Sequence, residues 1–340
     1  MKRINEIFAI AAAALLVFAA CSNNSDNNAA LLALVGTGGG GQSGDGGSGS
    51  GVITAGFVKV AAGTYSGSAA LTPTSSVFIS GRTVPISVLY VCDHEVTQGE
   101  YETYCKYGGT TPTAEDKGVG ANYPVYNVSW YDAVVYCNLR TIAEFGSDAE
   151  CVYSLNDVKN PANWTGIVGD ENTKYCGPSS TISTWDYKGE GDSDGGIKFD
   201  PTKKGYRLPT EAEWEYIARN KNQDSYTYSG SNTIDNVAWY TTNSGSKTHE
   251  VKTDKVSGKN SANGLGIYDM SGNVWEWCHD WHDSITASTD ALGASSGSSR
   301  VSRGGGWHSF DGSCSVASRD GNIPGGRGDF LGFRVVRTAN

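Results

Sequence analysis

The C-terminal stretch, residues 303–337, is the part of the sequence that most limits what this chain can fold into. Its two ends, residues 303–307 and 332–337, have the pattern of short strands next to tight turns. The residues between them are mostly Gly, Ser and Asp. Glycine has no side chain to bury, so this middle segment cannot build a core. It is therefore predicted to be an exposed loop system on a rigid base, and such loops often carry binding sites.

The residues of this segment fall into two interleaved sets. Those with the character of a structural framework are Cys314, Val316, Ala317, Arg319, Pro324 and Arg327. The others are predicted to contact a ligand and are Trp307, His308, Ser309, Phe310, Gly312, Ser313, Ser318, Asp320, Gly321, Asn322, Ile323, Gly325, Gly326, Gly328, Asp329 and Phe330. Large side chains usually provide most of an interface's energy, so Phe310 and Phe330 are expected to be strong contributors. Because both lie outside the framework set, their replacement is expected to leave the stability of the fold nearly unchanged.

Residues 1–20 have the composition of a signal peptide for export. Lys2 and Arg3 are basic, an apolar run follows, and small residues precede Cys21. This pattern resembles a bacterial lipoprotein signal, so Cys21 is predicted to carry a lipid anchor. The protein is then expected at the outer membrane or cell surface, attached to the membrane only through lipid. Ordinary secretion, with Cys21 incidental, is the alternative.

Residues 21–51 are rich in Asn, Ser and Gly and are predicted to form a flexible tether, which leaves residues 52–340 as the folded domain. The chain contains 38% hydrophobic and 11% aromatic residues, enough for a buried core. Its formal charge of -10 argues against nucleic acid as a partner. The sequence has no nucleophile elbow and no phosphate-binding loop, and spacing alone defines no catalytic triad.

Three helices are predicted from their first turns. Thr97, Ser129 and Thr210 are each followed three residues later by an acidic residue, which is the pattern of a capping box. Strands are expected over residues 52–65 and 85–92 because apolar residues recur there at strand spacing. Residues 147–200 are irregular and are predicted to be an insertion.

Five motifs in the order of the chain resemble the formylglycine-generating-enzyme family of sulfatase-modifying factors. They are PVYNVSWYDA (124–133), RLPTEAEWEY (207–216), GIYDMSGNVWEW (266–277), RGGGW (303–307) and GFR (332–334). The resemblance extends over residues 52–340. It implies an α+β, C-type lectin-like fold of the formylglycine-generating-enzyme type, with much irregular structure.

The pattern of fixed residues after Trp307 is also similar to that of treponemal variable proteins, which are diversified by a retroelement. This resemblance implies a surface-displayed lipoprotein that binds a ligand through residues 307–330 and has no catalytic activity. Codons altered by such a retroelement cannot come to encode Met, Trp, Lys, Glu or Gln, and the candidate positions after Trp307 contain none of these. The ligand is expected to be a protein, a peptide or a glycan.

A copper-dependent oxidase is the main alternative function. Enzymes of the family bind copper(I) through two cysteines, and two soft thiolates suit that ion. The second cysteine matches Cys314, but the first falls on Ser309, whose hydroxyl is a poor copper(I) ligand. No copper is therefore expected, and Cys314 is interpreted as a small buried residue. A structural envelope lipoprotein without a variable ligand is a further alternative.

The resemblance also implies a structural calcium site. The family's ligands match the side chains of Asp269 and Glu276 and the carbonyls of Gly272 and Val274, an all-oxygen set that suits a hard cation. The alternative is that both carboxylates only brace the surrounding turn.

Other metal and disulfide patterns in the sequence are weaker. His279 and His282 lie three residues apart but lack a clear set of further ligands, so they are poor evidence for a metal site. Without Cys21, the exported chain contains an odd number of cysteines. Cys151 and Cys176 enclose much of the insertion and are the pair suspected of forming a disulfide.

Overall fold

The structure is a computed structural model that describes residues 55–67, 71, 73–105, 117–164, 196–253 and 262–339. These residues belong to one compact unit, Ile53–Asn340. The predicted signal peptide, the predicted lipidation site Cys21 and the predicted tether lie outside the described residues. Within the described ranges, no helix combines the length and apolar character needed to cross a membrane.

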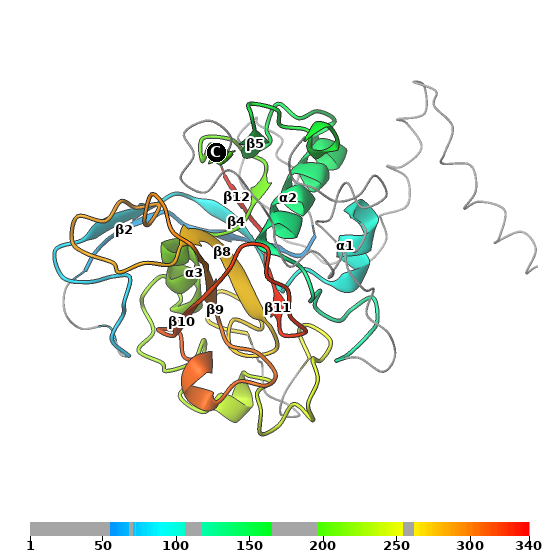
Figure 1. Cartoon of the computed structure of the whole chain (residues 1–340). Helices are drawn as coiled ribbons and strands as arrows, with labels where there is room; N and C mark the ends of the chain where they lie inside the picture. The colour runs from blue at the N-terminus through cyan, green and yellow to red at the C-terminus, as the bar shows by residue number, and fades with distance from the viewer. Residues whose placement is uncertain are drawn as a thin grey trace, which may run out of the picture. The chain divides into compact units, whose positions relative to one another are not determined.

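An antiparallel sheet joins the beginning and the end of the folded domain. Its strand order is β1-β4-β12-β7, with bounds Phe57–Val60, Leu89–Cys92, Val336–Thr338 and Tyr206–Arg207. In this sheet Val91 lies opposite both Val58 and Val336. The last strand of the chain therefore lies beside one of the first (Figure 1).

A second sheet carries the C-terminal segment that the sequence singled out. Its strand order is β10-β9-β8-β11, with bounds Arg319–Asn322, Arg300–Arg303, Trp275–Trp281 and Leu331–Gly332. Strands β8, β9 and β10 pair antiparallel, whereas β11 runs parallel to β8. Two further pairs are formed by β2 with β3 and by β5 with β6, with bounds Gly63–Ser66, Thr83–Ile86, Tyr153–Leu155 and Ile197–Phe199. Short strands and three helices confirm the predicted α+β class.

All three predicted helices are present and begin as their capping boxes indicated. They are α1, α2 and α3, with bounds Gln98–Tyr104, Trp130–Phe145 and Glu211–Ala218. In each, the cap side chain accepts from the third backbone amide and the acidic residue accepts from the cap's own amide. Short 3₁₀ turns occupy Pro161–Asn163, Ile234–Asn236 and Asp311–Cys314.

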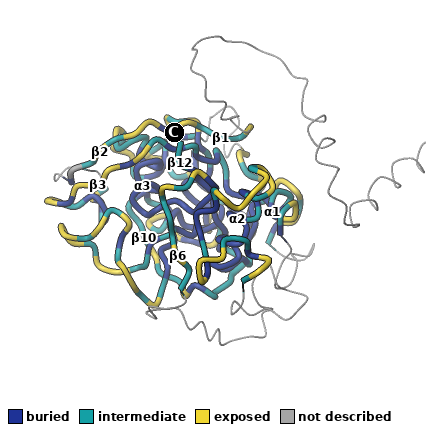
Figure 2. The backbone as a smooth tube through the Cα atoms, turned by 90° about the horizontal axis from the view of Figure 1, so that it is seen from above, coloured by how far each residue is buried: buried dark blue, intermediate teal, exposed yellow. Residues whose placement is uncertain are grey.

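Three of the largest fully buried side chains are tryptophans on α2, α3 and β8. Trp130, Trp214 and Trp277 are fully buried, and their indole nitrogens donate to Cys278 O, Glu276 Oε2 and Val128 O. Figure 2 shows the buried stretches gathered in the interior of the domain. Satisfying each indole donor allows these large rings to be buried without an unpaired polar group.

Each of the two predicted strands corresponds to parts of two separate strands in the structure. The stretch predicted as one strand over 52–65 contains β1 and the start of β2, separated by two exposed alanines. The stretch over 85–92 contains the end of β3 and all of β4, which pair with different partners. The chain passes from one sheet to another at both places, and residue spacing does not report such a change of partner.

The predicted insertion is only partly irregular. Strands β5 and β6 lie near its two ends and pair with each other, so that Tyr153 lies opposite Phe199. Residues 165–195 and Cys176 lie outside the described residues, and the suspected Cys151–Cys176 disulfide therefore stays a prediction. Cys151 itself is buried, with its thiol donating to Asn138 O at 3.6 Å.

Candidate functional site

The candidate face begins with a glycine turn that leaves β9. Gly304 and Gly305 have φ values of 94° and 76°, which side chains rarely adopt. A Cβ on Gly305 would also lie 2.7 Å from Cys314 Sγ. The turn therefore requires glycine, and it directs the following residues away from the sheet into the loop system.

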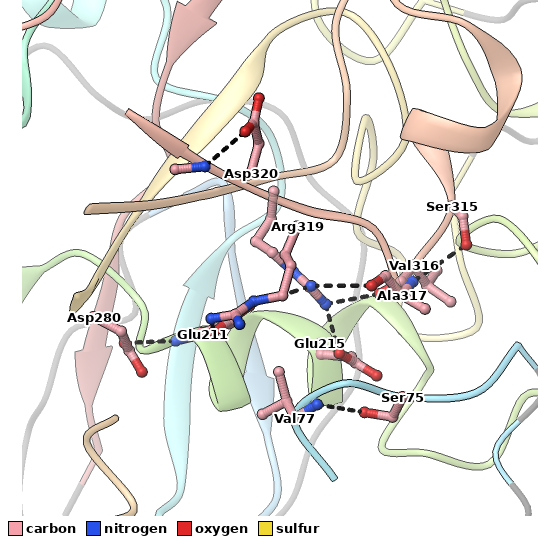
Figure 3. Close-up of polar contacts among 12 residues, drawn as sticks. Ser75, Val77, Glu211, Glu215, Asp280, Ser315, Val316, Ala317, Arg319 and Asp320 are labelled. Carbon is pink, nitrogen blue, oxygen red and sulfur yellow. Dashed lines mark hydrogen bonds and ion pairs between the residues drawn. The ribbon is translucent and has the colours of Figure 1, made fainter. Parts of the chain in front are cut away.

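Arg319 fixes the middle of the segment to the first turn of α3. Its Nε and Nη2 donate to the two carboxylate oxygens of Glu211, at 2.8 and 2.7 Å. Glu211 is 1% exposed, and its backbone amide donates to Asp280 Oδ2 (Figure 3). A forked guanidinium–carboxylate pair fixes orientation as well as position, so Arg319 is an anchor of the segment.

A fully buried arginine, Arg303, holds the neighbouring part of the segment. Arg303 Nη2 pairs with Glu215, and its guanidinium also donates to the carbonyls of Val316 and Ala317. Glu215 in turn accepts from Arg219 Nε at 2.8 Å. All three ionic side chains are fully buried, and each charge has an opposite partner, which is the condition for burying charge.

Arg327 fixes the last part of the segment to the first turn of α2. Its Nε and Nη2 donate to Asp132 Oδ2, at 3.0 and 2.8 Å. The same oxygen accepts from the Ser129 amide at 2.7 Å. Next to this pair, the Trp130 amide donates to Pro324 O. The loop before β11 is thus held on the N-terminal turn of a helix.

Three of the four apolar framework residues are buried, in agreement with the framework role that the sequence suggested. Cys314 and Val316 are at most 1% exposed, and Pro324 is also buried. Cys314 packs with Tyr228, Val237, Ala238 and Tyr240. Ala317 is only half-buried and contributes its backbone carbonyl rather than its side chain.

Most of the predicted contact positions are at least partly accessible. Phe310 is 76% exposed and Ile323 is 65% exposed, the largest exposed fractions among the large hydrophobic side chains of the described residues. The other exposed candidates are His308, Gly312 and Asp320. Those of intermediate burial are Trp307, Ser313, Ser318, Gly321, Asn322, Gly325, Gly326, Gly328, Asp329 and Phe330.

Ser309 is a correction to the predicted contact set because it is buried. Its hydroxyl accepts from Trp275 Nε1 at 3.1 Å and from the Gly306 amide at 3.0 Å. The side chain is therefore part of the turn's internal structure and does not point to a ligand. Burial also raises the pKa of the Cys314 thiol to about 12. The Ser309 hydroxyl is a poor ligand for copper(I), so the two-cysteine set of the family enzymes is incomplete at these positions.

Phe330 is a second correction, because it is not a free contact position. It packs against the core cluster that contains Trp275 and Leu331, and its carbonyl accepts from the Trp275 amide at 2.8 Å. Its ring lies 4.6 Å from that of His308, centroid to centroid. This packing changes the expectation for Phe330: its replacement is now predicted to destabilise the fold.

Trp307 forms the edge of the same aromatic group. Its indole nitrogen donates to Asp329 O at 2.9 Å, its ring centroid lies 5.2 Å from that of His308, and Lys117 Nζ lies 5.0 Å from it. Lys117 was missed by the sequence analysis because it is 190 positions away along the chain. The aromatic group thus presents a partly accessible surface with one cation beside it.

The four predicted calcium ligands all belong to buried residues. Glu276 is fully buried, and its carboxylate accepts from Arg334 Nη2, Arg334 Nε and Trp214 Nε1. Asp269 Oδ2 accepts from the Lys252 amide at 2.7 Å. Gly272 has a φ of 81° and lies in the turn between the two carboxylates. Val274 is also fully buried.

Glu95 adds a third carboxylate that the sequence analysis missed. Its oxygens accept from the Val274 amide and the Asn273 side chain. Burial raises the pKa of the Glu95 carboxyl, and the charges of Asp269 and Glu276 raise it further, whereas Arg334 lowers it. Both oxygens of Glu276 already accept from Arg334, and among the described residues these three carboxylates are not close enough together to form a metal-binding group. Calcium binding here therefore stays a prediction, and bracing of the turn stays its alternative.

The two histidines that invited a metal interpretation have other roles. His279 stacks on Phe199 with ring centroids 3.8 Å apart, and burial lowers its pKa well below the usual value. His282 lies against Gly321, where a Cβ would come within 2.7 Å of the imidazole. Among the described residues, neither histidine belongs to a group of side chains that could hold a metal ion.

Known proteins share both the sequence and the fold of this chain. The family described as Sulfatase-modifying factor enzyme 1-like domain matches residues 50–339. The chaperone protein LppX of Paenibacillus barcinonensis is 33% identical over 283 residues, which cover 78% of this chain and 85% of LppX. A formylglycine-generating enzyme of Streptomyces coelicolor is 33% identical over 150 residues, which cover 40% of this chain and 48% of the enzyme.

The fold is also similar to that of a protein of known structure. Treponema denticola variable protein 1 superposes with a TM-score of 0.63 at 32% identity, and the alignment covers 83% of this chain and 95% of that protein. The resemblance first read from five motifs is thereby confirmed over most of the chain, and this chain belongs to the family of sulfatase-modifying factor enzyme 1-like domains.

Proposed function

We propose that this protein is an exported, lipid-anchored binding protein whose ligand contacts the face formed by residues 307–330, without catalysis. One observation carries the proposal: within this segment, fixed anchors alternate with accessible positions. Arg319 and Arg327 pair with buried carboxylates on two helices, while large apolar groups such as Phe310 and Ile323 point to solvent. A face built this way can change its contact residues without losing its base.

The same alternation supports diversification of the face by a retroelement. Changes at accessible positions leave the buried pairs intact, so the fold tolerates them. The similarity to a protein described as a variable protein is consistent with this use of the fold. A near-copy of the coding sequence for residues 307–334 beside a reverse-transcriptase gene is the expected genomic signature.

The ligand is proposed to be a protein or a peptide. The most exposed large side chains of the face, Phe310 and Ile323, are both apolar. Aromatic anchors such as Phe310 concentrate binding energy at protein interfaces. The chain is also similar to a protein described as a chaperone, LppX, over most of that protein's length. A glycan ligand is the alternative, and the lectin-like fold alone does not favour it.

Randomisation of selected positions tests the proposal. A library varied at His308, Phe310, Gly312, Asp320 and Ile323 is expected to remain mostly folded and to yield members with new ligands when displayed. A matched library varied at Arg319, Arg327, Val316 and Cys314 is expected to be mostly unfolded. Equal loss of folded members in both libraries would contradict the proposed division of the face.

The oxidase alternative has its own test. The full chain is loaded with copper(I) and incubated with a cysteine-containing sulfatase peptide, and formylglycine is measured by mass spectrometry. No conversion is expected, because Ser309 Oγ is committed to two hydrogen bonds inside the turn. Conversion by the wild type that is lost in Cys314→Ser would establish the enzyme instead.

A further inference from the structure

Cys92, His94 and Glu100 form a cluster that neither the variable face nor the calcium site uses. Cys92 is the last residue of β4, and Glu100 lies in the first turn of α1. The cysteine Sγ, a nitrogen of the histidine ring and a glutamate oxygen lie within 4.8 Å of one another. Among the described residues, no other group of His, Cys, Asp and Glu side chains meets this condition.

The two sides of the His94 ring have different partners. Nε2 lies 3.2 Å from Glu100 Oε2, and Cys92 Sγ lies between the two ring nitrogens, 3.9 Å from Nε2 and 3.7 Å from Nδ1. Nδ1 is hydrogen-bonded to Asp93 Oδ1, and the other oxygen of Asp93 is paired with Lys252 Nζ at 2.9 Å. A carboxylate on one ring nitrogen fixes the tautomer and leaves the other nitrogen to bind a metal, as in carboxylate–histidine–metal arrangements.

The separations suit a tetrahedral ion. With metal bonds of about 2.3 Å to sulfur and about 2.0 to 2.1 Å to nitrogen or oxygen, neighbouring ligand atoms lie about 3.3 to 3.6 Å apart. The distances of 3.2 and 3.9 Å from Nε2 are close to this range.

The helix cap holds Glu100 in place for this role. Its Oε2 accepts from the Thr97 amide at 3.0 Å, and its Oε1 lies 3.6 Å from Arg140 Nη1. The carboxylate therefore faces His94 without depending on a metal for its position. The glutamate side chain is 29% exposed and that of His94 is 14% exposed, so an ion and a water molecule can reach the cluster.

We propose that Cys92, His94 and Glu100 bind a divalent ion such as zinc, with Asp93 orienting the His94 ring through its hydrogen bond to Nδ1 and a fourth position open to water. One sulfur, one nitrogen and one oxygen ligand form a borderline-soft set, unlike the all-oxygen set at Asp269 and Glu276. The alternative is an imidazolium that forms ion pairs with Asp93 and Glu100 and binds no metal.

Cobalt spectroscopy of the full chain tests the proposal. The reduced, metal-free protein is titrated with Co²⁺ in the presence of millimolar calcium, which occupies any all-oxygen site. The wild type is expected to show a thiolate-to-cobalt absorption band that Zn²⁺ displaces. Cys92→Ser is expected to lack the band, whereas Cys105→Ser, a matched change of a buried cysteine at the other end of α1, is expected to retain it.

Two conservative variants keep the test valid if Cys92→Ser fails to fold. Glu100→Gln preserves the capping box, since glutamine also accepts from the cap amide, and Asp93→Asn preserves the hydrogen-bonding shape. Each is expected to lower zinc affinity by about 10- to 100-fold with unchanged far-UV circular dichroism. Absence of a cobalt band in the wild type, or unchanged affinity in both variants, would overturn the proposal in favour of the metal-free ion pairs.

Discussion

The ion pair between Arg327 and Asp132 is expected to be a main support of the variable face. The side chains are 12% and 1% exposed, and both guanidinium contacts reach one carboxylate oxygen. Arg327→Ala leaves the Asp132 carboxylate buried with only its Ser129 contacts. Removing one partner of a buried pair costs about 3 to 5 kcal/mol, and the low end, about 3 kcal/mol, is appropriate because Arg327 is partly accessible.

Urea unfolding followed by tryptophan fluorescence measures this change. With an m-value of about 3 kcal/mol/M, a loss of about 3 kcal/mol lowers the midpoint by about 1 M. Lys198→Ala is the control, because Lys198 and Asp157 form an ion pair whose side chains are 60% and 81% exposed. Exposed pairs contribute little, so the control midpoint is expected to stay nearly unchanged.

A double-mutant cycle separates the ion pair from other effects of the alanine. Asp132→Asn keeps an oxygen that accepts from the Ser129 amide and removes the charge. Arg327→Ala is expected to cost much less in this background than in the wild type, which gives a coupling energy of about 2 kcal/mol. An equal cost in both backgrounds, or a cost below about 1 kcal/mol in the wild type, would refute the anchoring role.

The loss of stability caused by Arg327→Ala is expected to depend on pH in a definite direction. Burial raises the pKa of the Asp132 carboxyl, and Arg327 is the largest opposing influence, so Arg327→Ala raises this pKa further. A carboxyl with a raised folded-state pKa favours folding at low pH, and this contribution is lost as pH rises through that pKa. The stability difference between wild type and variant is therefore expected to be smaller at mildly acidic pH than at neutral pH. A difference that grows on acidification contradicts the reasoning.

Three further predictions follow from burial and charge. Phe310→Ala is expected to leave the melting temperature nearly unchanged, whereas Phe330→Ala is expected to destabilise the domain by about 1.5 to 3 kcal/mol because its ring packs on the core; equal effects in thermal melting contradict this. Calcium is expected to raise the melting temperature of the wild type but not of Asp269→Asn, and an identical response in both argues against that site. Iodoacetamide is expected to leave Cys314 unmodified at neutral pH in the folded protein, since burial keeps its thiol protonated; rapid labelling detected by peptide mass spectrometry is the contrary result.

The helix starts and the family could be read from the sequence because they depend on local patterns. A capping box is complete within four residues, so Thr97, Ser129 and Thr210 each predicted a helix that the structure confirms. The five motifs identified the family in the same way. Strand number was predicted less well, since pairing depends on distant partners and each strand spans only a few residues.

The sequence by itself also determined which residues of the terminal segment have framework character. Only the tertiary structure decided what each of them does. Arg319 and Arg327 find their carboxylates 108 and 195 positions earlier in the chain. Ser309 is removed from the contact set by its hydrogen bond with Trp275, and Phe330 is restricted by packing of its side chain against the core. The physical reason is that composition indicates whether a side chain can be exposed, whereas burial and ion pairing depend on which distant residues the fold brings beside it.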